Sequence, residues 1–134
     1  MRRTLPSISF LLALYSFIAY GSSVLLADNW PQWRGPNGDG TSSERGLPTR
    51  WSKTENVVWR LPLPGPSGAT PAIWGEHIFL TSLRPKADYV LFCVSRSGDI
   101  RWTRKLSTAE EAPKEGEGNA SAPSPTTDGK HVWA

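Results

Sequence analysis

Apolar and polar residues alternate over short runs in the middle of the chain, which is the pattern of half-buried β-strands. Ile100, Trp102 and Leu106 follow a period of two, and Arg104 is the exception. The expected strands of one sheet cover residues 69–74, 77–82, 89–95 and 100–106. No stretch has the i, i+3, i+4, i+7 spacing of an amphipathic helix, so the pattern predicts an all-β fold.

Turn-forming residues separate and flank these runs. Gly75 and Gly98 stand between expected strands. Glycine suits tight turns at these places because it adopts positive φ, which other residues adopt only with difficulty. Val57–Leu61 is a further β-prone run, and the Gly- and Pro-rich residues 28–56 before it should form an irregular lead-in. Ser107–Ala122 is rich in Glu, Gly and Pro and is expected to be a solvated connecting loop.

The first 27 residues have a different composition. Arg2 and Arg3 precede an apolar run over Ile8–Tyr20, and small residues are frequent over Gly21–Ala27. This order is typical of a secretory signal peptide. The apolar run has 13 residues, fewer than the roughly 20 that span a bilayer as a helix. We therefore expect residues 1–27 to be removed on export to the periplasm or the medium, leaving no membrane span. An uncleaved anchor is the alternative, and the pattern does not fix the exact cleavage site.

Charge and cysteine content narrow the classes of function. The chain has 15 basic and 12 acidic residues, and loss of Arg2 and Arg3 leaves 13 against 12. Such a balance offers no basic stripe for nucleic acid, so no nucleic-acid partner is expected. Cys93 is the only cysteine. It cannot form an internal disulfide, and its apolar neighbours predict a buried, inert thiol.

An internal repeat is the most informative feature. Residues 71–79 (PAIWGEHIF) return fifty-four residues later as residues 125–133 (PTTDGKHVW), with Pro, Gly and His in register. A second echo links Trp59 with Trp102, each followed by Leu four residues on. Repetition of this kind is typical of architectures built from stacked units.

The repeat unit corresponds to a four-stranded antiparallel blade at about residues 69–106, with the next beginning at about 120–134. One such sheet exposes two faces and two edges, and radial stacking of several sheets covers them. Residues 57–134 are therefore expected to form part of a β-propeller. Ala134 falls inside an expected strand, so we expect the chain to be the N-terminal part of a longer protein.

These residues resemble the β-propeller repeat of the pyrroloquinoline-quinone (PQQ) family, whose motif reads A-x-D-x-x-T-G-x-x-x-W. In the matching stretch, residues 93–102, Gly98 and Trp102 keep their spacing and Ser97 stands where Thr is usual. The turn is one residue shorter, and Ser95 occupies the place of Asp. The opening residues 29–36 (NWPQWRGP) resemble the lead-in of secreted bacterial, planctomycete-like propellers. The resemblance covers about residues 29–134.

The resemblance implies two classes of function, between which fold alone does not decide. One class is a non-catalytic binding scaffold, similar to the propeller of the outer-membrane protein assembly machinery, with a protein or another extracellular ligand as partner. The other is a quinoprotein dehydrogenase that binds PQQ and calcium, here with its active site in further blades. A fragment without function is a third possibility.

Few residues suggest chemistry. Residues 37–40 (NGDG), with Glu44, resemble a calcium loop but lack its ordered ladder of oxygen ligands. His77 and His131 could be metal ligands or bases, yet their recurrence in the repeat favours a structural role. We therefore predict no catalytic or metal-binding residue and no cofactor in these 134 residues. The binding scaffold is the leading hypothesis, and an enzyme is the less favoured one.

The tryptophans suggest packing more than a binding platform. Trp59 and Trp102 occupy corresponding places in the second echo, so each should fill space between neighbouring sheets. Trp30 and Trp33, in the lead-in, could cover the exposed side of a terminal blade.

Overall fold

The described part of the chain is all-β. The computed structural model describes residues 28–85, 88–108 and 123–134, and within them every regular element is a strand. The expected signal peptide, residues 1–27, and residues 109–122 of the connecting loop lie outside the described residues. The strands are β1 (Ala72–Trp74), β2 (His77–Arg84), β3 (Asp88–Ser95), β4 (Ile100–Thr108), β5 (Thr126–Thr127) and β6 (Val132–Trp133).

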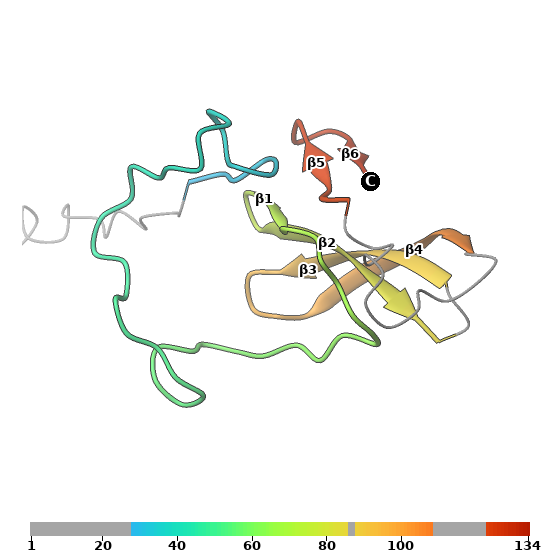
Figure 1. Ribbon diagram of the computed structural model, residues 1–134, viewed down its shortest axis with the longest axis horizontal. Helices are drawn as coiled ribbons and strands as arrows, with labels where there is room; N and C mark the ends of the chain where they lie inside the picture. The colour runs from blue at the N-terminus through green and yellow to red at the C-terminus, as the bar shows by residue number, and fades with distance from the viewer. Residues whose placement is uncertain (1–27, 86–87, 109–122) are drawn as a thin grey trace, which may run out of the picture.

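The main sheet is an antiparallel meander of order β1-β2-β3-β4, with β5 and β6 forming a separate hairpin (Figure 1). Strands β2, β3 and β4 extend beyond the expected ranges to the pairs Arg84–Asp88 and Asp88–Thr108. Lys105 and Thr108 hold the Asp88 carboxylate at 2.7 and 2.8 Å, which fastens this end of the sheet. The sequence pattern missed these pairs because the residues that form them are polar.

The first strand is shorter than expected. It begins at Ala72, although the expected run begins at residue 69. Pro71 has no N–H to donate, and the Thr70 N–H donates to Ser124 Oγ at 2.9 Å. The chain before Ala72 is therefore bound to the segment that leads into β5, and does not pair with β2.

Strand β3 is the centre of the core because both of its faces are covered. Phe79, Leu91 and Cys93 are buried on one side, where Ala72 and Val132 pack against them; we call this the hairpin face. Val90, Phe92 and Val94 are buried on the other side, which we call the segment face. Successive side chains of a strand point to opposite faces of the sheet. Because every residue from 90 to 94 is apolar, both faces of β3 must be covered by other parts of the chain.

The residues 57–65, here called the covering segment, lie over the segment face. Trp59 and Leu61 pack against its buried side chains, while Val58 is 95% exposed. Residues 57–61 of the covering segment are the β-prone run noted in the sequence, but none of residues 57–65 belongs to a strand. Its side chains still alternate between sheet and solvent. Figure 1 shows this part of the chain running along one side of the sheet, opposite β5 and β6.

Trp59 docks on the turn between β3 and β4. Its indole Nε1 donates to the Arg96 carbonyl oxygen at 2.6 Å. Gly98 has a φ of +90°, and a Cβ built there would lie 2.7 Å from the Trp59 ring. Glycine is therefore needed at residue 98 for its backbone conformation and for the close approach of the indole.

The repeat seen in the sequence is also a structural repeat of hairpins. In β1 and β2, Ala72 pairs with Phe79 and Ile73 with Ile78. The residues fifty-four positions later pair in the same register in β5 and β6, with Thr126 opposite Trp133 and Thr127 opposite Val132. The two hairpins contact each other through β1 and β5. Two successive copies of one unit thus lie side by side.

The start of the lead-in lies between the two hairpins. Trp30 exchanges two backbone hydrogen bonds with Ile73 of β1, at 2.9 and 2.7 Å. The next residue, Pro31, accepts a hydrogen bond from the Thr127 N–H of β5 at 2.9 Å. Residues 30 and 31 therefore join the first strands of two successive hairpins, while Trp33 is 63% exposed.

Substitution of Gly98 by Ala tests the docking of Trp59. We expect Gly98→Ala to lower the free energy of unfolding by about 2–4 kcal/mol, because a strained positive φ adds to overpacking against the indole. Gly75→Ala is the matched control, since Gly75 also has positive φ but meets no atom within 4 Å. It should cost about 1 kcal/mol. Urea titration followed by tryptophan fluorescence measures both, and equal losses would contradict the docking.

Candidate functional site

The two histidines occupy equivalent, exposed positions just after the hairpin turns. The His77 ring lies 6.1 Å from the Phe79 ring, and the His131 ring lies 5.7 Å from that of Trp133, two residues on in each case. Each histidine therefore sits beside the aromatic residue that follows it on the same face of its strand. Within residues 28–85, 88–108 and 123–134, no group of three His, Cys, Asp or Glu side chains could hold a metal ion.

Asp128 closes the turn of the second hairpin. Its Oδ1 accepts hydrogen bonds from the backbone N–H groups of His131 and Lys130, at 2.7 and 2.8 Å. These two bonds, and the His131 ring beside the second carboxylate oxygen, lower the pKa of Asp128 from 3.8 to about 2. Trp74 stands at the corresponding place in the first hairpin, so this carboxylate is not part of the repeat.

The residues that resemble a calcium loop form hydrogen-bonded turns. Asp39 Oδ1 accepts from both the N–H and the hydroxyl of Thr41, at 2.9 and 2.8 Å, which lowers the pKa of Asp39. Glu44 Oε1 accepts from the Asp28 N–H at 2.6 Å. Asp39 thus binds Thr41 and Glu44 binds Asp28, so the two carboxylates accept hydrogen bonds from different parts of the lead-in.

Cys93 is fully buried on the hairpin face. Burial raises the pKa of its thiol, because the thiolate would lose the solvation that water provides. Both features confirm the expectation of a buried thiol.

Three tryptophans lie against glycines. Beside Trp59 on Gly98, the Trp30 ring covers Gly35 and the Trp74 ring covers Gly129 of the second hairpin. Trp102 lies on the hairpin face with its ring 6.1 Å from that of Phe79, and it is 38% exposed. Trp59 and Trp102 therefore pack on opposite faces of the sheet. The sequence reasoning missed Trp74, whose contact joins the two repeats.

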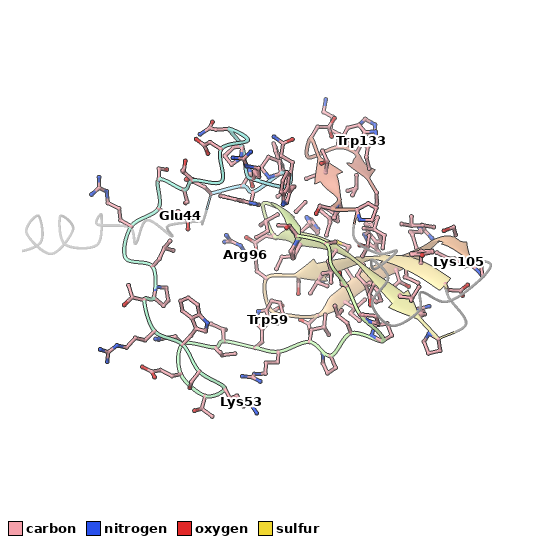
Figure 2. The ribbon with its side chains drawn as sticks, in the orientation of Figure 1. Glu44, Lys53, Trp59, Arg96, Lys105 and Trp133 are labelled. Carbon is pink, nitrogen blue, oxygen red and sulfur yellow. The ribbon has the colours of Figure 1, made fainter. Side chains whose placement is uncertain are left out.

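A cavity opens where the lead-in meets the sheet. Its volume is about 210 Å³, and Trp30, Ile73 and Ile78 supply apolar walls. The same cavity is lined by Asp28, Ser42, Glu44 and Arg96, which carry polar or charged groups. Figure 2 shows Arg96 at the end of the sheet that faces the part of the lead-in carrying Glu44. Arg96 Nη1 also lies 3.7 Å from Glu76 Oε1.

A second cavity, of about 200 Å³, shares Asp28, Trp30 and Ser42 with the first and is lined by lead-in residues alone. The first cavity is the better candidate for a ligand, since it combines an apolar wall with charges of both signs. This is the usual composition of a binding site, in which apolar walls supply affinity and a few polar groups fix orientation. No sequence signal marked it, because its residues come from four separate segments.

Comparisons with known proteins add no relative: no family model, no curated protein and no solved structure matches this chain. Among the described residues, no helix is long and apolar enough to cross a membrane.

The lowered pKa of Asp128 predicts a stability effect at acid pH. A folded-state pKa below the unfolded value stabilises the folded chain when the carboxyl is charged. This contribution is complete above the ordinary value of 3.8 and is lost as the pH falls towards about 2. In Asp128→Asn, we expect a flatter dependence of the unfolding free energy over this range. Unfolding in urea at a series of pH values checks it, and unchanged dependence would refute the assignment.

Burial of Cys93 predicts slow reaction with thiol reagents. We expect an aromatic disulfide to modify the native chain at least about tenfold more slowly than the chain in urea. In the native chain, burial shields the Cys93 thiol from the reagent and disfavours the reactive thiolate form. Absorbance of the released thiolate follows both reactions. Equal rates would show that residues 90–94 are accessible.

Proposed function

We propose that this chain forms the first part of an exported, PQQ-like β-propeller that acts as a non-catalytic binding scaffold. The observation that carries the proposal is the pair of hairpins, β1-β2 and β5-β6, which share one register and lie side by side. Successive blades of a propeller repeat in this manner around a common axis.

The covering of the main sheet supports the blade assignment. One face packs against the covering segment and the other against Val132 of the next repeat unit. Trp59 stands 43 residues before Trp102 and docks on the Gly98 turn of the blade that follows it. We propose that Trp102 docks in the same way on the corresponding turn of the next blade, which would cover its exposed ring.

The use of the acidic side chains supports a scaffold over an enzyme. Asp39, Asp88 and Asp128 each accept hydrogen bonds from neighbouring residues and thereby hold turns or strand ends. Quinone-dependent oxidation requires a carboxylate base and calcium ligands directed at one site. The first cavity is instead bordered by apolar walls and charges of both signs, a composition suited to binding.

Site-specific photo-crosslinking tests the scaffold function. A benzophenone residue in place of Ser42, which lines the first cavity, should yield a discrete adduct with a protein or peptide partner in cells that export the chain. The same residue in place of Lys53, exposed on the same lead-in, is the control and should not yield that adduct.

A direct assay separates this function from quinoprotein catalysis. Calorimetric titration of the purified full-length protein with PQQ and calcium should show no binding, and a dye-linked assay with alcohols or sugars should show no turnover. Quinone binding together with turnover would replace the scaffold by a dehydrogenase. Absence of both the Ser42 adduct and the turnover would leave neither function standing.

A further inference from the structure

The backbone nitrogen of Asp28 is held by an acidic side chain from sixteen residues further on. It lies 2.6 Å from Glu44 Oε1, slightly shorter than the roughly 2.7–2.9 Å usual for charge-assisted hydrogen bonds from nitrogen. In addition, the Ser43 hydroxyl donates to Asp28 Oδ2 at 3.2 Å. Two neighbouring residues of the lead-in thus bind the main chain and the side chain of Asp28.

The expected signal peptide ends just before this nitrogen. A charged start, an apolar run and a stretch rich in small residues end at Ala27, and polar residues begin at Asp28. This is the order in which a secretory signal peptide is followed by the mature chain.

The geometry points to cleavage of the Ala27–Asp28 peptide bond, with the new α-ammonium group of Asp28 bound by the Glu44 carboxylate. A signal peptidase would catalyse hydrolysis by water, which leaves a carboxylate on Ala27 and an ammonium group on Asp28. The inference rests on the export included in the proposed function. Cleavage replaces one amide N–H by three charged donors at a position where a carboxylate already lies.

This ion pair would close the lead-in on the blade. Trp30, two residues after the new terminus, is paired with Ile73 of β1. Glu44, sixteen residues after Asp28, would bind that terminus and so hold the chain between them against the blade. Asp28, Glu44 and Arg96 all line the first cavity, so the ammonium group would add a positive charge to its rim. Export would thereby complete the charged rim of the binding site.

The test begins with the identity of the mature N-terminus. The full encoded chain is expressed in a host with a general secretory pathway, and the exported product is analysed by intact and peptide mass spectrometry. We expect Asp28 to be the first residue. A first residue before Asp28 leaves the Asp28 nitrogen in an amide, and a first residue after it removes Asp28. Either result overturns the inference, even where crosslinking at Ser42 still finds a partner.

The second measurement detects the ion pair itself. At about pH 7.5, close to the ordinary pKa of an α-amino group, an amine-acylating reagent modifies only the uncharged amine. Glu44→Gln should speed acylation of the Asp28 nitrogen by about 1.5- to 5-fold, the factor expected for an exposed ion pair. Lysine acylation in the same sample serves as the internal reference.

Glu55→Gln is the matched control, because Glu55 is also an exposed carboxylate of the lead-in and its hydrogen bonds with Ser52 involve only the Glu55 backbone. It should leave the acylation rate unchanged. High salt should reduce the difference between wild type and Glu44→Gln, since salt screens exposed charges. Equal rates for wild type and Glu44→Gln at low salt overturn the ion pair.

Discussion

The structure depends on the burial of β3 from both sides. A strand that carries Val90, Phe92 and Val94 on one face and Leu91 and Cys93 on the other cannot leave either face in water. Each fully buried side chain of this size contributes about 1.5–3 kcal/mol. A single antiparallel sheet has no second layer of its own, so the cover must come from chain segments before and after it.

The segments that cover β3 are attached through contacts between a tryptophan ring and a glycine. Trp59 before the sheet covers Gly98, and Trp74 within the sheet covers Gly129 of the next hairpin. In both places the glycine has positive φ and no space for a Cβ. The large flat indole buries much area against bare backbone, and the turn it covers becomes a docking point. Contacts of one kind therefore link the covering segment to the sheet and the sheet to the next repeat unit.

The candidate binding site is a consequence of the same arrangement. The lead-in must reach β1 and β5 to join the two hairpins at Trp30 and Pro31, and this path leaves a cavity between the lead-in and the end of the sheet. Its apolar wall is shared by Trp30 of the lead-in, Ile73 of β1 and Ile78 of β2. Its charged rim comes from Asp28 and Glu44 of the lead-in and from Arg96 of the turn between β3 and β4. The cavity therefore arises from the way the lead-in joins the repeat unit.

The sequence by itself determined the strands and their repetition. Alternation of side chains is a local property of a strand, so the presence of β2, β3 and β4 followed from the pattern, although their polar ends did not. The shared register of the hairpins followed from the repeat around Gly75 and Gly129. Only the tertiary structure decided that the β-prone residues 57–61 cover a face without joining a sheet, and that Glu44 meets Asp28. Such contacts join residues far apart in the chain, and no local pattern encodes which distant surface a segment will meet.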